Sequence, residues 1–190
     1  MSDIAAELAK LHNLQGADYS RQVEHIARMG DFHPVEGEFG IYSVGGESGN
    51  DYENLLNAAR KAVFHGYKVY ILPNPSGTKT ADFIFERKEV YRLIELKTIQ
   101  GSSSVSNRLA DSISQSNHVL LNMTTRYNGG LLAVQIKSYF EKNDNALEVL
   151  IFKGKDLLSI KRRFVFQKDF GSADFSSWQS RPIKNKGWQA

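Results

Sequence analysis

The chain has 190 residues and a formal net charge of +3, with 41% hydrophobic and 24% charged residues. These are globular values, which exclude a disordered chain and fit one ordinary domain with a small appendage at most. No cysteine is present, so disulfides, thiolate metal sites and cysteine nucleophiles are excluded. No apolar run is long enough to span a bilayer and no signal peptide is recognisable, so we expect a cytoplasmic site of action.

The pattern of apolar residues and breakers divides the chain into three parts. Residues 1–45 predict a helical N-terminal extension, with helices at 3–14 and 20–30 followed by a strand at 36–44. Residues 46–168 predict the main domain, and 169–190 a basic tail. In the main domain we expect helices at 52–66 (capped by Asp51), 102–116 and 129–142, and strands at 67–72, 81–85, 90–99, 118–123, 146–152 and 157–166. This order predicts an α+β fold, with one mixed or antiparallel sheet flanked by helices.

Charges of both signs occupy interior positions of the strand predicted at 90–99. Because side chains alternate along a strand, Glu95 and Lys97 share one face, while Ile94 and Leu96 share the core face. Asp82 opens the preceding strand, and a hairpin between the two strands would bring it near Glu95. Two carboxylates can hold a divalent cation against a phosphate, and a lysine can orient water or neutralise developing negative charge. The pattern therefore indicates phosphodiester cleavage.

The spacing of Asp82, Glu95 and Lys97, on consecutive strands after a helix, resembles the PD-(D/E)xK nuclease superfamily. Ala81 stands where that family usually has proline. The resemblance implies a Mg²⁺-dependent DNA nuclease in which Asp82 and Glu95 are metal ligands and Lys97 positions the hydroxide. The structural alternative is a salt bridge of Glu95 with Lys97, or with a cross-strand neighbour, on an exposed sheet face.

A second resemblance covers residues 51–163. The strings "GYKVYILPNPSGTKTADFIFE", "ELKT", "VLLN" and "EVLIFKGKDLLSIKR" occur in the order typical of the C-terminal tRNA-nuclease domain of contact-dependent growth inhibition (CdiA-type) toxins, and related domains end mobile-element polypeptides. This resemblance implies a barnase–EndoU–colicin–RelE type of fold that cleaves RNA, here tRNA, without a metal cofactor. It implies Glu95 as general base, with Lys97 and Arg108 stabilising the phosphorane, and a cognate immunity protein as partner.

The helix predicted at 102–116 places Arg108 and Gln115 on one side, with Ser104 a turn earlier. Val105, Leu109 and Ile113 form the neighbouring stripe, which is expected to pack against the sheet. The helix begins shortly after Lys97 and Thr98, so its free N–H groups and serine hydroxyls are expected to face a phosphate. The substrate-binding candidates here are Thr98, Ser104 and Gln115. The alternative for the serines is ordinary helix capping.

Basic residues near the last predicted strand pair form the best candidate for contacts to the substrate backbone. They are Lys153, Lys155, Lys161, Arg162 and Arg163. The alternative is a solvated edge hairpin that lysines protect against aggregation. No histidine has a second one at ligand spacing, and His118, at an element boundary, is expected to be solvated or to contact a helix end.

Three hypotheses follow from the sequence. The first is an endoribonuclease, a tRNA-cleaving toxin-like domain that needs no cofactor and binds RNA. The second is a Mg²⁺-dependent DNA nuclease of the PD-(D/E)xK kind. The third is a non-catalytic module of a mobile element that binds nucleic acid or a protein partner.

Overall fold

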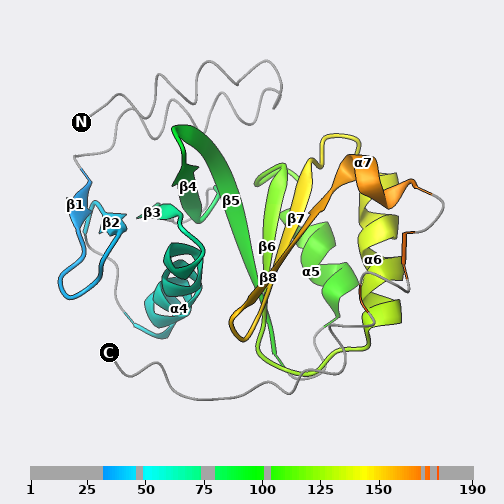
Figure 1. Cartoon of the computed structure of the whole chain (residues 1–190), viewed down its shortest axis with the longest axis horizontal. Coiled ribbons are helices and arrows are strands. Elements are labelled where there is room, and N and C mark those ends of the chain that lie inside the picture. The colour runs from blue at the N-terminus through cyan, green and yellow to red at the C-terminus, as the bar shows by residue number, and fades with distance from the viewer. Residues whose placement is uncertain are drawn as a thin grey trace.

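The computed structural model describes residues 32–45, 49–73, 80–100, 104–167, 170, 171 and 175. The helices predicted at 3–14 and 20–30, most of the loop after residue 73 and the basic tail apart from residues 170, 171 and 175 lie outside the described residues. The described part is an eight-stranded mixed sheet with helices on both faces, which confirms the predicted α+β fold (Figure 1).

The strands follow one another across the sheet in sequence order, from β1 to β8. They are β1 (His33–Pro34), β2 (Ile41–Ser43), β3 (Lys68–Ile71), β4 (Phe83–Arg87), β5 (Val90–Ile99), β6 (His118–Met123), β7 (Glu148–Lys153) and β8 (Asp156–Lys161). Neighbours are antiparallel except in the pairs β2–β3, β5–β6 and β6–β7, which are parallel. Strands β1 and β2, within residues 1–45, belong to this same sheet; the boundaries at 45 and 168 stay a prediction.

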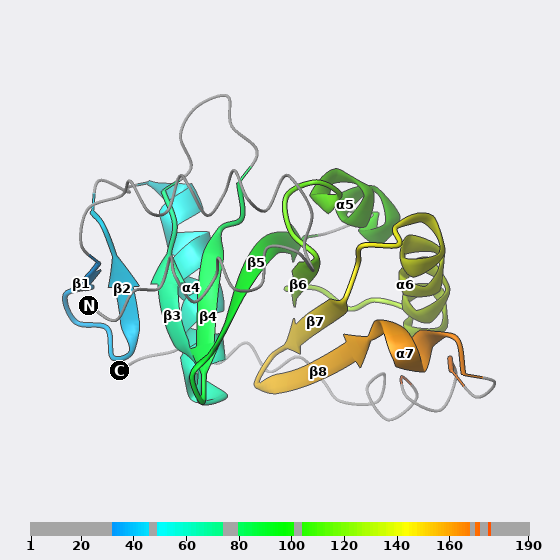
Figure 2. The same cartoon turned by 90° about the horizontal axis from the view of Figure 1, so that it is seen from above.

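Strand β5 joins two halves of the sheet. Its first half, Val90–Ile94, pairs antiparallel with β4, and its second half, from Glu95 to Ile99, pairs in parallel with β6. Figure 2 shows β5 crossing from the side of β3 and β4 to the side of β6 and β7. The strand therefore exchanges one neighbour for the other between Ile94 and Glu95.

Helices cover the two faces over different parts of the sheet. Helix α4 (Asn50–Phe64) packs one face through buried residues such as Ala59 and Ala62 against Ile94, Leu120 and Phe152. Helices α5 (Val105–Ser112) and α6 (Gly129–Lys142) cover the other face, over β5 to β8, where Ile99, Leu121, Ile136, Phe140 and Ile151 are buried. Apolar runs in β6 and β7 reflect this cover on both faces.

Several predicted helices and strands begin or end at other residues than expected. The strand predicted at 36–44 shortens to β2, because Gly37 and Gly40 adopt positive φ angles of 75° and 71° and turn the chain. Helix α4 begins at Asn50 after Gly49, and no side chain caps it; Asp51 lies inside the first turn instead of capping it. The Asp51 carboxylate still stabilises the helix, because its negative charge lies near the positive, N-terminal end of the helix dipole.

The strand predicted at 157–166 ends at Lys161, and Arg162–Val165 form the short helix α7. The Arg162 guanidinium donates to the carbonyls of Phe140 (2.9 Å) and Asn143 (2.8 Å) at the end of α6. These bonds satisfy helix-end carbonyls and fix the point where the chain leaves the sheet. The helix predicted at 102–116 also ends early, at Ser112, and Ser114 follows with a φ of 79°.

Candidate functional site

Asp82 lies immediately before β4, and its carboxylate is fixed against β5. The regular β4–β5 pairing ends at Phe83 and Ile94, and the Asp82 N–H still donates to the Ile94 carbonyl at 3.1 Å. Beyond that point the side chain replaces the backbone, because the Leu96 N–H donates to Oδ2 of Asp82 at 2.7 Å. The end of the ladder thus holds Asp82 beside the following residues of β5, as the predicted hairpin required.

Glu95 is buried, with 2% of its surface exposed, and it faces Asp82. Its Oε1 accepts from the Lys97 ammonium, whereas Oε2 accepts from no N–H or hydroxyl donor of the described residues, and a hydrogen bond between the carboxyls of Glu95 and Asp82 requires one of them to be protonated. Burial raises the pKa of Glu95 to about 8, the negative charge of Asp82 adds to this, and Lys97 opposes it. Burial also raises the pKa of Asp82. With both acids ionised, the pair would carry more negative charge than Lys97 alone can balance, so it retains a proton near neutral pH.

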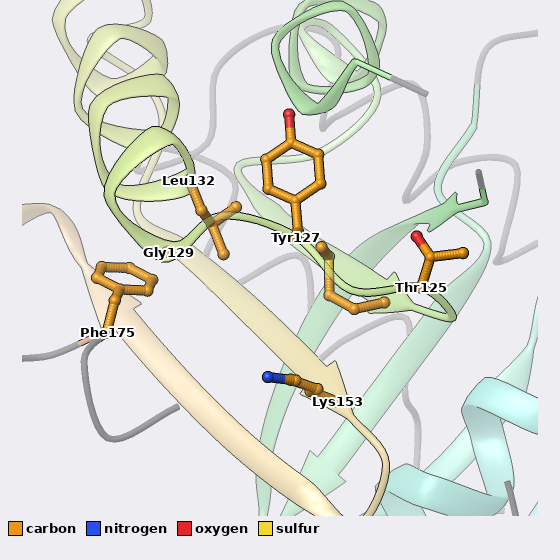
Figure 3. A pocket seen from close by; sticks show the side chains of 7 residues that line it. Thr125, Tyr127, Gly129, Leu132, Lys153 and Phe175 are labelled. Carbon is orange, nitrogen blue, oxygen red and sulfur yellow. The ribbon is translucent and has the colours of Figure 1, made fainter. Parts of the chain in front are cut away.

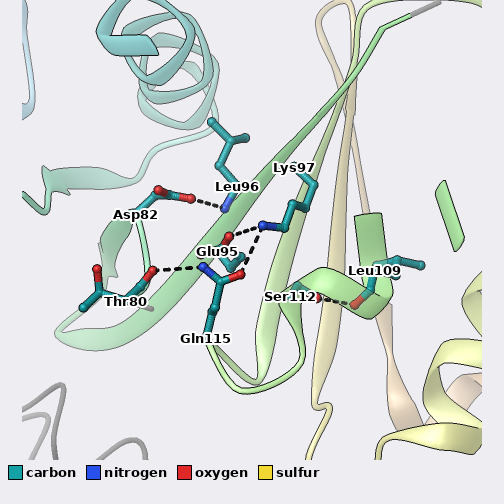
Figure 4. A network of polar contacts seen from close by, with 8 residues as sticks. All are labelled: Thr80, Asp82, Glu95, Leu96, Lys97, Leu109, Ser112 and Gln115. Carbon is teal, nitrogen blue, oxygen red and sulfur yellow. Dashed lines mark hydrogen bonds and ion pairs between the residues drawn. The ribbon is translucent and has the colours of Figure 1, made fainter. Parts of the chain in front are cut away.

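Lys97 is held from two sides, as Figure 4 shows. Its ammonium contacts Glu95 and also donates to Oε1 of Gln115 at 3.2 Å, while Nε2 of Gln115 donates to the Thr80 carbonyl at 3.5 Å. Gln115 reaches this position from the turn after α5, not from the helix as predicted. We call Asp82, Glu95, Lys97 and Gln115 the Glu95 cluster; it joins three segments that are distant in sequence.

The donor set of the Glu95 cluster fits a hard divalent cation. Paired carboxylates are the ligands that Mg²⁺ prefers, and the buried, unpartnered oxygen of Glu95 is the kind of atom that a cation would satisfy. The described residues contain no group of three or more acidic or histidine side chains at ligating distance. Since Mg²⁺ usually keeps several waters and takes substrate phosphate oxygens, two protein carboxylates suffice for it.

The other residues predicted around Lys97 do not contact the cluster. Arg108 is exposed on α5 and forms no ion pair with any residue that the structure describes. Ser104 caps α5, accepting from the Asn107 N–H at 3.5 Å. Thr98 is half-buried on β5 and, by strand alternation, lies on the opposite face from Lys97. Of the predicted apolar stripe of α5, Val105 and Leu109 are buried, but Ile113 is 39% exposed.

The predicted basic patch is not continuous. Lys153 and Lys155 lie at the turn between β7 and β8, whereas Lys161 pairs with Glu148 at the opposite end of the hairpin. Six strand residues place the two ends roughly 17–20 Å apart. Arg162 binds the end of α6 and also forms an ion pair with Asp144 at 2.9 Å, so its role in this structure is in the fold.

A second buried acid, which sequence analysis did not single out, lies on the opposite face of the sheet. Glu148 is 4% exposed; its Oε1 accepts from Ser159 at 2.5 Å and its Oε2 lies 3.7 Å from the Arg92 guanidinium. His118, predicted to be solvated or at a helix end, is buried beside them, and burial with the charges of Arg92 and Lys161 lowers its pKa to about 3. We call Arg92, His118, Glu148 and Ser159 the Glu148 cluster. In the sequence, the sign of this cluster is Glu148, a charged residue directly before the apolar run 149–152.

Comparisons with known proteins give one distant structural similarity. No family model matches the chain, and no curated protein matches it. Among solved structures, the CdiA-CT/CdiI toxin and immunity complex from Burkholderia pseudomallei is similar over 60% of this chain and 89% of the matched chain, with 17% sequence identity and a TM-score of 0.40. None of the described helices has the length and apolar character needed to cross a membrane.

Proposed function

We propose that the protein is a nuclease that cleaves phosphodiester bonds at the Glu95 cluster, with Asp82 and Glu95 holding a divalent cation, Mg²⁺ in the first instance. The observation that carries this proposal is the pair of apposed carboxylates, one with an unpartnered buried oxygen, next to a fixed lysine. A structural salt bridge of Glu95 and Lys97 would need only one acid. The second acid raises the pKa of the first, which is a cost that metal binding would reverse.

Each residue of the cluster has a role in the proposed reaction. When bound, the cation would neutralise charge on the phosphate and acidify a water. Asp82, held by the Leu96 N–H, and Glu95, held by Lys97, provide carboxylate oxygens in a fixed arrangement. Gln115 orients the Lys97 ammonium, which lies ready to stabilise the negative charge that develops on the phosphate.

The metal-free route has less support from the geometry. It needs Glu95 as a general base, and a pKa of about 8 lies near the working pH that such a base requires, so the pKa of Glu95 fits both routes. It also assigns Arg108 to the phosphorane, and Arg108 makes no contact with the cluster among the described residues. The sequence resemblance of residues 51–163 to tRNA-nuclease domains makes tRNA the substrate that we propose first, with duplex DNA second and a cognate immunity protein as partner.

The test is cleavage of total tRNA and of duplex DNA by the full chain, with Mg²⁺ or with EDTA. We expect Mg²⁺-dependent cleavage of tRNA that leaves phosphate and hydroxyl ends, and about a 10³-fold loss of rate in Glu95→Gln. Glu141→Gln, which changes an exposed acid on α6, is the matched control and should retain full activity. If neither nucleic acid is cut, or if Glu95→Gln equals wild type, the proposal is wrong. Cleavage in EDTA with 2′,3′-cyclic phosphate ends would instead establish the metal-free route.

A further inference from the structure

The carboxyl ends of β5 and β6 differ on the two faces of the sheet. On the α6 face, Met123 at the end of β6 lines a small pocket, shown in Figure 3, with room for about one water molecule. On the α4 face, the next-to-last residues of the two strands are polar, and Thr98 of β5 pairs with Asn122 of β6. The carboxyl ends of parallel strands are a common location of ligand sites in sheets covered by helices.

Helix α4 places a lysine over Asn122. Lys61 is 8% exposed, and its ammonium donates to Oδ1 of Asn122 at 2.6 Å. One turn earlier on α4, Oδ1 of Asn57 accepts from Nδ2 of Asn122 at 3.4 Å. One turn later, at the end of α4, the ring of His65 stacks on Phe152 of β7 with 5.7 Å between centroids. This stripe of side chains four residues apart therefore crosses from β6 to β7, and Lys61 lies at its centre.

The positive charge of Lys61 has no counter-ion in the part of the chain that the structure describes. No carboxylate there lies within ion-pair distance, and the one acceptor of the ammonium is a neutral amide oxygen. Burial lowers the pKa of Lys61, and no described charged group adds to this effect or opposes it. Buried charges in proteins are normally paired, so an ammonium with two unused N–H donors favours the binding of an anion.

Two neutral donors lie beside Asn122. Strand pairing holds the Thr98 hydroxyl next to it, and the hydrogen bond from Asn122 holds the amide of Asn57. Neither the Thr98 hydroxyl nor Nδ2 of Asn57 makes a hydrogen bond with another described residue. Both side chains are only half-buried, so a ligand can reach these donors from solvent although Lys61 itself is buried.

We propose that Lys61, Asn57 and Thr98 bind a carboxylate group on the α4 face of the sheet. A carboxylate carries one negative charge, which balances one ammonium, and its two oxygens accept several hydrogen bonds. Because Lys61 is largely buried, a compact planar anion fits better than a phosphodiester with a sugar on each side. By strand alternation Glu95 lies on the other face of β5, so this binding does not depend on nuclease activity.

Stepwise replacement of chloride by acetate at constant ionic strength, with the ¹⁵N-labelled full chain, tests the site. We expect saturable shifts of the side-chain amide signals of Asn57 and Asn122. In Lys61→Met the affinity should be at least tenfold weaker, because a charge-assisted hydrogen bond is lost. Lys137→Met, which changes an exposed lysine on α6, is the matched control and should stay within about twofold of wild type. Glu95→Gln should also bind acetate like wild type, which separates this result from the nuclease assay.

A second variant tests the site without changing its charge. Thr98→Val keeps the shape of the side chain and removes the hydroxyl, so we expect an affinity about fivefold weaker than that of wild type. This variant takes the place of Lys61→Met if the latter does not fold. Unmoved amide signals, wild-type affinity in the variants, or tighter binding of inorganic phosphate than of acetate would overturn the proposal. Lys61 would then only connect α4 to β6.

A capped tripeptide with a central glutamate identifies the source of the carboxylate, with the glutamine version as its control. Binding of the glutamate peptide and of acetate assigns the site to an acidic side chain of a protein partner. Binding of acetate without the peptide assigns it to a small free carboxylic acid. Equal binding of the glutamine peptide would contradict recognition of a carboxylate.

Discussion

Two buried glutamates lie on opposite faces of the same sheet and differ in how their charge is balanced. Glu148 has a partner at each oxygen, the hydroxyl of Ser159 and the guanidinium of Arg92. Glu95 has Lys97 at one oxygen, none among the described residues at the other, and a second carboxylate, Asp82, beside it.

The difference separates a structural acid from a candidate functional one. A buried carboxylate is tolerated when cations and donors satisfy its oxygens, as around Glu148. Two apposed acids with one unpartnered oxygen reduce stability unless something else binds there, and such perturbed groups concentrate at functional sites. The two glutamates are almost equally buried, at 2% and 4% exposed, so their partners and not their burial distinguish them.

The largest expected effect comes from removing the structural acid. Glu148→Ala leaves the Arg92 guanidinium and the Ser159 hydroxyl without their partner, so we expect a loss of about 3 kcal/mol in the free energy of unfolding. Urea unfolding measures this loss. The rate of nucleic-acid cleavage per folded molecule should stay at the wild-type level; a fall comparable to that of Glu95→Gln would erase the distinction between the clusters.

Glu95 contributes a pH dependence to stability. Its pKa is about 8 in the folded protein against an ordinary value of 4.5, so between these pH values the folded state holds a proton that the unfolded chain has released. This contribution falls as pH rises through the window, by up to about 1.4 kcal/mol per pH unit, whereas the lowered pKa of His118 acts in the opposite direction below pH 6.5.

Glu95→Gln mimics the protonated acid, so its fall in stability between pH 5 and pH 7 should be smaller than that of wild type by about 2 kcal/mol. Urea unfolding of both proteins at the two pH values measures the difference, in which other titrating groups cancel. Added Mg²⁺ should stabilise wild type more at pH 7 than at pH 5, and should not stabilise the variant. If the free energy of unfolding changed with pH in the same way in both proteins, the pKa of Glu95 would not be raised in the folded state.

The smallest expected effects come from the neutral partner in each cluster. Gln115→Ala removes an acceptor of Lys97, so kcat should fall about tenfold with little change in stability, because only the orientation of the ammonium is lost. Ser159→Ala should cost about 1 kcal/mol of stability and leave kcat unchanged. Steady-state kinetics and urea unfolding on both variants give the comparison. A loss of stability in Gln115→Ala and a fall of kcat in Ser159→Ala would show that the Glu95 cluster is structural and the Glu148 cluster functional.

Much of the fold was readable from the sequence because the apolar periodicity is strong in the middle of the chain. The order of elements from α4 to β8 and the α+β class are confirmed. The errors lie at the ends of helices and strands, where tertiary contacts override the local pattern of apolar residues. Arg162 bends the chain after β8 by binding carbonyls of α6, and a strand pattern of alternating side chains gives no sign of that contact.

The candidate site was predictable in part. Strand alternation and one hairpin placed Asp82, Glu95 and Lys97 together, because period and pairing are local properties. Gln115 was predicted as a substrate-binding residue on the helix; its contact with Lys97 was not predicted, and it is made from the turn after α5. The second partner of Gln115 is the Thr80 carbonyl, and since every residue carries a carbonyl, no sequence pattern could single it out.

The exchange of neighbours within β5 has a consequence for how the Glu95 cluster forms during folding. Asp82 arrives with the β4 side of the sheet, and Gln115 arrives with the α5–β6 side. A truncated chain that has folded only the β4 side or only the α5–β6 side lacks part of the Glu95 cluster. The proposed cleavage therefore requires both sides of the sheet, and fragments that contain only one side are expected to be inactive.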